Sequence, residues 1–598
     1  MALAETVLRK VYKLGLLPKL FLILPRVSFL LALASVAWLL MLPMDGQFRN
    51  TYISENALMP GQVTSYFRES EWNYVRGFRS EVVNWNFSEM STDNELLTNW
   101  LQDFGWSVSK HRDPKTNTTT TYAIMHAPRG DNTEAMVLVV PYFTSEGMPN
   151  KGGLTLGPAL ANYFAKMSIW SKNLILVFPH NGHSVLRSWV EAYHTTLDAT
   201  AGSIDAALVV EYPSDSDAFG HLEINYEGLN GQLPNLDLIN TVTTVASHEG
   251  IRVSVQGMSP DDIDKRDYWS RLQVFASGIL RLATAGISSK SPGCESFSGW
   301  QIQAITISAA GEKGHDVTQF GRIIDSSFRS VNNLLEKFHQ SFFFYLLMSP
   351  RHFVSIGTYL PAAVLVAVSF AISSLYSLAS GVTTPEFITH ISDVLFIFTG
   401  IEAVCLLLSL LMQTIVVNAT EGYTTTITIV YGLVISTLVT VLSTLAGNNI
   451  KILSKTHSYM LLAFALFFIA MLIVSMLIVH FALAFSIGIC ALPLTFIQPL
   501  INMCNAGNGS LIKHKLRIAM CLLISSPITV VVALGYLIND GGMFGIANFS
   551  HGLFVSWDAM QSWTYFIIAL GWYPAWSAIA VACIFGDFRI ESVKQKAD

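Results

Sequence analysis

Apolar and polar positions divide the chain into an N-terminal apolar run, a middle region of short alternating segments, and a C-terminal half of repeated apolar runs. The first run, VSFLLALASVAWLLML from Val27 to Leu42, follows five basic residues and precedes a polar stretch around Asp45. A cleaved signal peptide and a retained anchor both fit such a run. The long basic leader, and the lack of a small-x-small cleavage motif before Met44, favour the anchor.

Beyond Arg351 the apolar runs recur at lengths that cross about 30 Å of hydrocarbon. One helix of about 40 apolar residues is too long for a bilayer, so the run 459–500 is divided at His480. Seven helices are expected in this half, at 355–378, 394–416, 424–445, 459–479, 481–500, 517–538 and 563–586. With the first run they make eight spans.

The basic residues predict the sidedness of these spans. If the N-terminus is cytosolic, every lysine and arginine after Arg351 falls in a cytosolic loop or tail; they are Lys451, Lys455, Lys513, Lys515, Arg517, Arg589, Lys594 and Lys596. Lys594 and Lys596 have the KxKxx-type spacing of a coat-protein retrieval signal, which would place the chain in the endoplasmic reticulum membrane, or they form an ordinary basic flank. The predicted organisation is a cytosolic segment 1–26, a span 27–43, a lumenal domain 44–350, seven spans within 351–588 and a cytosolic tail 589–598.

Composition agrees with a membrane protein. The chain is 51% hydrophobic and only 13% charged, which excludes a soluble protein of this length. A net charge of −6 without a basic stripe argues against nucleic-acid binding. Cys294 is the only cysteine outside the apolar half, so the lumenal domain cannot close an internal disulfide. Asn86 and Asn117 begin glycosylation sequons, which fit a lumenal side.

The middle region alternates expected strands with expected helices, a pattern typical of βαβ units and a mostly parallel sheet. The strands are predicted at 134–143, 172–180, 205–212 and 251–257. An amphipathic run from Arg322 to Leu347 is expected to follow the membrane surface into the bundle. The fold class is therefore a membrane α-helical protein with a lumenal α/β domain.

Sites in α/β folds gather at the carboxyl ends of strands, where His180, Asn181 and Glu211 fall. A later loop offers His315 and Asp316. A zinc hydrolase needs three or more converging ligands and an open water position, and this spacing does not distinguish such a site from structural histidines. The E-x-x-H pair Glu191 and His194 is interpreted as a surface pair. Nothing near Cys294 suggests an activated thiolate.

Within the bundle, two features stand out. Glu402 lies near the middle of an expected span, where an ionised carboxylate is costly. Ion coupling and transport remain an alternative there, although no second intramembrane charge is in register. The segment GWYPAW places Trp572, Pro574 and Trp576 together in the last span, a shape suited to a lipid.

Several long sequence motifs resemble those of one protein family. MDGQFRNTYISENALMPGQ from Met44 to Gln62, MHAPRGD, RSWVEAYH, YEGLNGQLPNLDLIN, GHDVTQFGR and NNLLEKFHQSFFFYLL occur in family order. They closely resemble the glycosylphosphatidylinositol (GPI)-anchor attachment proteins, the large polytopic subunit of the GPI transamidase, with a spelling nearest to fungal members.

The resemblance implies an endoplasmic-reticulum complex that joins a precursor's new carboxyl end to the ethanolamine amine of a GPI lipid. Its catalytic cysteine is expected on a separate cysteine-protease-like subunit, so no catalytic residue is expected here. This chain would be a non-catalytic subunit that scaffolds the complex and binds GPI. Its partners would be the catalytic and further membrane subunits, the GPI lipid, and precursor proteins with C-terminal GPI signals. The alternatives are a metal-dependent peptidase or amide-forming enzyme of the lumen and, less favoured, a transporter.

The resemblance also implies a lumenal domain like the M28 zinc aminopeptidases, with a degenerate metal site. The expected His-x-Asp is replaced by Pro141, Tyr142 and Phe143, and the Glu-Glu pair by His180 and Asn181. The bridging aspartate corresponds at best to Asn150, which leaves Glu211 and His315. No metal or other cofactor is therefore expected. The alternative is one weakly bound metal ion at these remnant positions.

Two words are expected to contact the catalytic subunit or the GPI headgroup. They are Tyr52-Ile-Ser54-Glu55-Asn56 and Gly314-His315-Asp316, for which a structural turn and a helix cap are the alternative. The residues expected to contact lipid are Trp572, Pro574 and Trp576.

Overall fold

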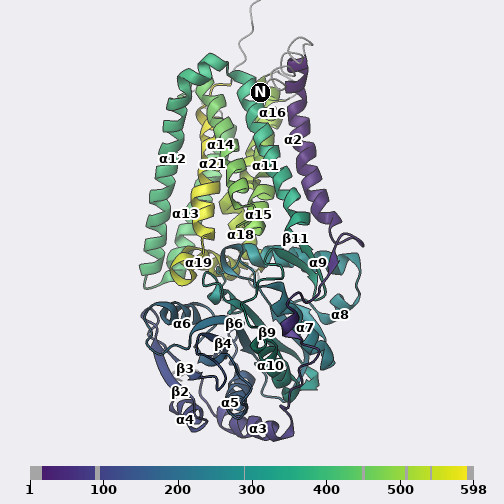
Figure 1. The fold of residues 1–598 in the computed structure, drawn as a ribbon. Coiled ribbons are helices and arrows are strands. Elements are labelled where there is room, and N and C mark those ends of the chain that lie inside the picture. Colours follow the sequence, from purple (N-terminus) through teal and green to yellow (C-terminus); the bar gives the residue numbers. More distant parts are fainter. Residues whose placement is uncertain are drawn as a thin grey trace, which may run out of the picture. The chain divides into compact units, whose positions relative to one another are not determined.

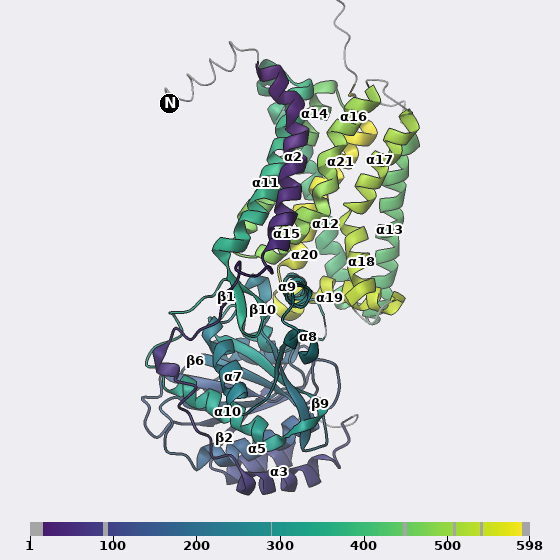
Figure 2. The same cartoon turned by 90° about the vertical axis from the view of Figure 1, so that its right-hand side faces the viewer.

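The computed structural model describes residues 16–87, 94–288, 290–446, 451–505, 510–538 and 542–588. They form two compact units, each drawn in Figures 1 and 2. The α/β unit comprises Met41–Thr358 and the short segment Asp558–Ser562, and the helical unit comprises the other described residues. The predicted retrieval signal at Lys594 and Lys596 lies outside the described residues, as does most of the predicted cytosolic segment 1–26.

An eight-stranded sheet forms the centre of the α/β unit, in the order β2-β3-β5-β4-β6-β9-β7-β8. Strands β5, β4, β6 and β9 are parallel neighbours, which confirms the predicted parallel centre. On the flanks, β2 pairs with β3, β3 with β5, and β7 with β9, all antiparallel, whereas the edge strand β8 is parallel to β7. The strands are β2 Ser107–Arg112, β3 Thr119–Met125, β4 Glu134–Val139, β5 Asn173–Phe178, β6 Ser203–Glu211, β7 Ala218–Asn225, β8 Val253–Val255 and β9 Gln303–Asp316.

Helices cover both faces of this sheet. Alternate residues of one strand serve opposite faces, so Leu138 joins one hydrophobic core while Val137 and Val139 join another. The larger core takes side chains from seven helices, and the smaller one from α6. The helices are α3 Glu69–Val82, α4 Glu95–Asp103, α5 Lys151–Ala165, α6 Ser184–Thr195, α7 Leu236–His248 and α10 Val317–Asn332, with α8 Pro260–Asp264 and α9 Tyr268–Ala283 alongside.

A second, three-stranded sheet corrects one expectation. The run Arg322–Leu347 does not form one amphipathic helix, because α10 ends at Asn332 and β10 covers Tyr345–Ser349. Strand β10 pairs with β11 His352–Ser355, which also pairs with β1 Arg49–Asn50. All five β10 residues are buried. The apolar stretch therefore packs in a sheet instead of on a lipid surface.

In the helical unit, seven described helices are long and apolar enough to span a membrane. A further pair, α17 Leu511–Ile524 and α18 Pro527–Ile538, is bent by 57° and gives the expected eighth span if it counts as one. Pro527, which lacks an amide donor, begins the second half of that pair. The others are α2 Leu16–Met41, α11 Ile356–Gly381, α12 Thr384–Asn418, α13 Gly422–Ala446, α14 Lys455–Met476, α15 Phe481–Ala491 continuing into α16 Ile497–Asn505, and α20 Thr564–Phe566 continuing into α21 Tyr573–Phe585.

Two features of the helical unit were not expected. Helix α19 Gly542–Met560 lies between the predicted spans 517–538 and 563–586, where no helix was predicted. The last span contains a π-helical segment, η5 Ile567–Trp572, immediately before Pro574. A π segment inside a helix frees backbone groups and often marks a functional position.

Candidate functional site

The carboxyl ends of β4, β5 and β6 meet at one edge of the main sheet. Val139 is paired with Val177 on one side and with Val209 on the other. The residues that follow these strands therefore lie together, and a bridge between Phe143 and Asn181 joins the first two connections. This is the edge where the sequence predicts a degenerate metal site.

Asn150 is fully buried at this edge, and its side chain is hydrogen-bonded to backbone groups. Its amide nitrogen donates to the carbonyl oxygens of Pro141 and Val210, both at 2.9 Å. Its amide oxygen accepts from the backbone N–H of Tyr212 at 2.7 Å. An aspartate could not make the two donations. Asn150 thus ties the end of β4 to the end of β6 through three hydrogen bonds to backbone groups.

Glu211 ends β6 and is almost completely buried. Its carboxylate accepts from the Ser145 backbone N–H at 2.6 Å, the Ser145 hydroxyl at 3.0 Å and the Ser308 hydroxyl at 3.1 Å. Burial raises the pKa of Glu211 to about 7, although these hydrogen bonds lower it in part. The carboxyl group is held by neutral donors.

We expect Glu211→Gln to stabilise the α/β unit at high pH. An acid whose folded pKa lies above its unfolded value costs stability as pH rises between the two, here from 4.5 to about 7. Gln removes that cost, about 3 kcal/mol above pH 7, and its amide fits the same hydroxyl partners. Thermal unfolding of the full-length chain should show a higher midpoint at pH 8 and little change at pH 4.5. The exposed Glu146→Gln is the control; equal shifts in both variants would refute this account of Glu211.

The replaced glutamate pair makes local packing contacts. The His180 ring lies 4.9 Å from the ring of Phe143, and burial lowers the pKa of His180. The Asn181 amide oxygen accepts from the backbone N–H groups of His183 and Val185, where α6 begins. These residues therefore support the first turn of a helix.

His315 does not join Glu211. Glu211 is paired with Ser308 in β9, and His315 lies seven residues further along the same strand, paired with Phe219. At about 3.3 Å per extended residue, this places it some 20 Å away. Asp316 forms a capping box at the start of α10, accepting from the backbone N–H groups of Thr318 and Gln319. The predicted remnant set Asn150, Glu211 and His315 thus does not converge.

In the α/β unit, no trio of His, Cys, Asp or Glu among the described residues brings its ligand atoms close enough to share a metal. The E-x-x-H pair does not do so either. His194 contacts the Val190 carbonyl through Nδ1 at 2.8 Å and stacks on Trp300 with ring centres 4.4 Å apart. Zinc sites need at least three protein ligands, and the described residues of the α/β unit bring no such group together.

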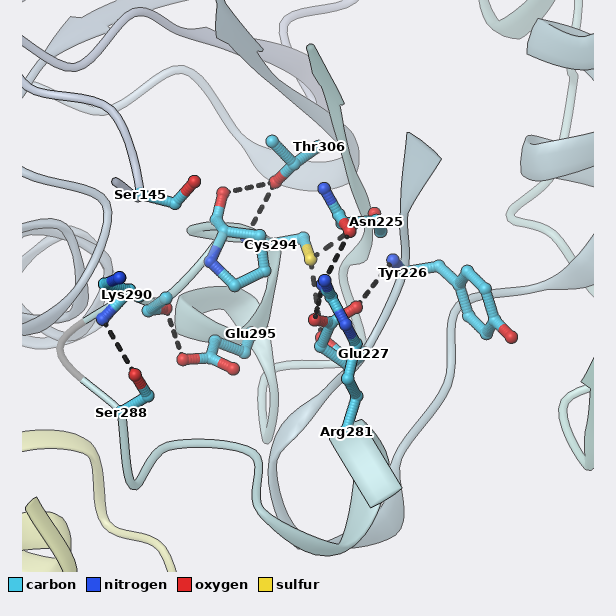
Figure 3. A network of polar contacts seen from close by, with 12 residues as sticks. Ser145, Asn225, Tyr226, Glu227, Arg281, Ser288, Lys290, Cys294, Glu295 and Thr306 are labelled. Carbon is cyan, nitrogen blue, oxygen red and sulfur yellow. Dashed lines mark hydrogen bonds and ion pairs between the residues drawn. The ribbon is translucent and has the colours of Figure 1, made fainter. Parts of the chain in front are cut away.

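Cys294 lies in a buried polar network (Figure 3). Its thiol is directed at the carbonyl oxygens of Asn225 and Glu227, at 3.6 and 3.4 Å. Burial raises the thiol pKa well above its usual value, and the nearby Glu227 and Glu295 carboxylates raise it further. A nucleophilic cysteine needs the opposite environment.

The carboxylates of Glu227 and Glu295 in that network also accept hydrogen bonds from neighbouring side chains. The Arg281 guanidinium donates to Asn225 Oδ1 at 2.9 Å and to Glu227 Oε1 at 3.3 Å. Ser291 donates to Glu295, whose pKa burial raises to about 8. Figure 3 shows these groups surrounding the thiol. The network joins the loop after β7 to α9 and to the turn that carries Cys294, which is a structural arrangement.

The segment Tyr52–Glu55 is fixed to the α/β unit. The backbone N–H groups of Ser54 and Glu55 donate to Asp237 on α7 at 2.8 and 2.7 Å. The buried Glu55 carboxylate accepts from the N–H groups of His339 and Gln340, both at 2.8 Å. Tyr52 is 55% exposed. Of the predicted contact segment, Tyr52 and Asn56 are exposed, whereas Ser54 and Glu55 are held by these hydrogen bonds.

The GWYPAW residues are mostly internal to the helical unit. Trp572 and Trp576 are 3% and 2% exposed, and the Trp576 indole donates to the Leu522 carbonyl at 2.8 Å. A neighbouring cavity of about 100 Å³ is lined instead by Tyr565, Ile568, Ala569 and Tyr573 with residues of α12, α13, α18 and α19. The two tryptophans pack inside the helical unit, and Ile568 and Ala569 of the π segment form part of the cavity wall.

Two groups of site residues escape sequence reasoning. Ser145 and Ser308 hold Glu211 from a loop and a neighbouring strand, and isolated serines give no signal. Tyr565 donates to the Ser409 carbonyl at 2.8 Å and lines the cavity, and no sequence motif indicates that contact. Glu402 has one carboxylate oxygen buried without a hydrogen-bond partner in the described residues. Asn86 and Asn117 are exposed, and their glycosylation stays a prediction.

Comparison with known proteins identifies the family. Residues 117–580 match the family described as Gaa1-like, GPI transamidase component. The chain is 40% identical to the GPI transamidase component GAA1 of Saccharomyces cerevisiae, over all of both chains. It is 31% identical to the gaa1 component of Schizosaccharomyces pombe over 58% of this chain and 62% of that one. Among solved structures, the chain is similar to the Legionella pneumophila LapA aminopeptidase, at 11% identity and a TM-score of 0.31, covering 48% of this chain and 78% of that one. It is also similar to a Porphyromonas gingivalis glutaminyl cyclase, at 12% identity and a TM-score of 0.27, covering 45% and 96%. The family match and the full-length yeast relative together show that this chain belongs to the Gaa1-like family of GPI transamidase components.

Proposed function

We propose that this chain is a non-catalytic subunit of the GPI transamidase, which scaffolds the complex and presents the GPI lipid to a catalytic cysteine on another chain. The observation that carries the proposal is how the predicted metal-site residues are arranged at the carboxyl ends of the central strands. Asn150 is committed to backbone groups, Glu211 is held by neutral donors, and His315 is remote from both. The domain then serves as a binding platform.

The bundle is the proposed lipid-binding part. The cavity beside the π segment is apolar and has room for a few methylene groups, and its walls come from several spans. We place the complex in the endoplasmic reticulum membrane, with the α/β unit lumenal and both termini cytosolic. The basic residues after Arg351 support that orientation, and the catalytic subunit, further membrane subunits and precursor proteins are the proposed partners.

A photoactivatable GPI analogue tests the lipid role. The purified complex is irradiated with the analogue, and the labelled peptides are mapped. We expect labels in η5 and the facing part of α12, and Ala569→Trp, which fills the cavity, should lower labelling several-fold. Val439→Trp, on an exposed α13 position, is the matched control. Labelling confined to other subunits would contradict the proposal.

Cys294 should be dispensable for chemistry. We expect Cys294→Ala to retain transamidation within about twofold of wild type, because the wild-type thiol is buried and its pKa is raised. Cleavage and GPI attachment are followed with a reporter precursor at equal amounts of assembled complex. The wild-type thiol should also resist alkylation until the chain is unfolded. Loss of more than 100-fold in activity from a complex that assembles normally would assign Cys294 a catalytic role.

A further inference from the structure

From the geometry of the helical unit, we infer a divalent-metal site of the zinc type, built by His390 and Asp393 of α12 and His457 of α14. Among the residues that the structure describes, this is the one group of three His, Cys, Asp or Glu whose ligand atoms all lie within 4.8 Å of one another. The inference is independent of the GPI-binding role proposed above. It concerns a different part of the molecule from the α/β edge.

Two of the three separations between ligand atoms match a tetrahedral ion. His390 Nδ1 and His457 Nε2 each lie 3.4 Å from the same Asp393 oxygen, Oδ2. Ligands about 2.0–2.1 Å from zinc in a tetrahedron stand about 3.3–3.4 Å apart. Such distances are long for hydrogen bonds from imidazole, which centre near 2.9–3.0 Å. The spacing thus suits three ligands around an ion better than two direct hydrogen bonds.

The surrounding residues orient the ligands. Residues three apart on a helix share one face, so His390 and Asp393 point together from α12. Ser454, the N-cap residue of α14, contacts His457 through the ring's other nitrogen, Nδ1. A hydrogen bond at the second nitrogen is what fixes the tautomer and orientation of metal-ligating histidines. The two imidazole rings lie 4.9 Å apart and nearly edge to face.

The position suits a clamp between two helices. Phe387 contacts Phe464, and Phe398 contacts Phe468, so α12 and α14 already pack side by side. The 35-residue α12 is longer than the roughly 20 residues that a span requires. The predicted spans 394–416 and 459–479 begin after Asp393 and His457, so the cluster lies in the helix turns that precede them. The Asp393 side chain is 56% exposed, which leaves a path for an ion and a fourth position for water.

The metal content of purified protein tests this site. The full-length chain, in its complex, is depleted of metal, loaded with Zn²⁺, desalted and analysed by mass spectrometry. We expect wild type to hold one zinc more per chain than His457→Ala or Asp393→Asn. His551→Ala is the control, since His551 lies on α19 and contacts Thr426 instead, and it should retain the wild-type content.

Cobalt substitution reports the geometry even if one variant assembles poorly. Co²⁺ bound to wild type should give the intense visible bands of tetrahedral coordination, and Asp393→Asn, which preserves side-chain volume, should weaken or shift them. Equal zinc content in wild type, His457→Ala and Asp393→Asn would overturn the inference. So would a Co²⁺ spectrum with only the weak bands of an octahedral ion, whatever the state of GPI binding.

Discussion

Replacing Lys172 by alanine is expected to destabilise the α/β unit by about 3–5 kcal/mol, because it leaves a buried carboxylate without its cation. The Lys172 ammonium lies 2.7 Å from Asp205 and also contacts Glu134, and the Lys172 and Asp205 side chains are each only 2% exposed. Burial raises the pKa of Asp205 even with that ammonium in contact. A second cation, Lys337, reaches Asp205 at 3.9 Å, and its side chain is 47% exposed.

Thermal unfolding of the full-length chain measures this effect, with an expected fall in the midpoint of roughly 10 °C. Lys151→Ala is the matched control, because its pair with Asp215 is partly exposed and such pairs contribute at most about 1 kcal/mol. Replacing Lys172 and Asp205 together by apolar residues should recover most of the loss. A single Lys172→Ala variant as stable as Lys151→Ala would show that the pair does not hold the strand ends.

Asn150→Asp is expected to lower stability by about 3 kcal/mol and to bind no additional metal. The substitution restores the carboxylate expected from zinc aminopeptidases, but it removes the two donations to the Pro141 and Val210 carbonyls. Two buried acceptors then lose their donor and face a carboxylate oxygen instead, and each buried unsatisfied group costs about 1–3 kcal/mol. Thermal unfolding and metal analysis of the same preparations measure both outcomes.

The control for this change is Asn84→Asp. Asn84 also donates its amide to a backbone carbonyl, that of Ser80 at 2.8 Å, but at an exposed position, so water replaces the lost bond. A variant Asn150→Asp that remains as stable as wild type, or that gains one zinc per chain, would show a retained metal site instead of a structural tie.

The central strands were predictable because parallel strands are buried on both faces and appear as continuous apolar runs. β4 and β5 fall within predicted segments, and β6 begins two residues before its predicted segment. The antiparallel flanks were missed, because β2 and the far end of β9 are polar and their pairing with distant strands gives no local signal. The run ending at Leu347 was misassigned for a related reason, since only pairing with β11 makes it a strand.

The site was predictable in its neighbourhood but not in its contacts. Strand ends in a parallel sheet meet, so Glu211 was expected at this edge; the family resemblance added Asn150, and both lie there. His315 was grouped with them because its motif resembles a ligand motif, whereas β9 continues past that edge and carries it away. The cavity in the bundle borders a π segment, and helical periodicity does not distinguish such a segment from ordinary helix.

The central claim, that this chain supplies no catalytic group to GPI attachment, is tested most directly by a combined variant. Glu211→Gln and Cys294→Ala are introduced together, and transamidation of a reporter precursor is measured at equal amounts of assembled complex. We predict activity within a few-fold of wild type. Loss of activity from a complex that assembles normally and still binds GPI would contradict the claim.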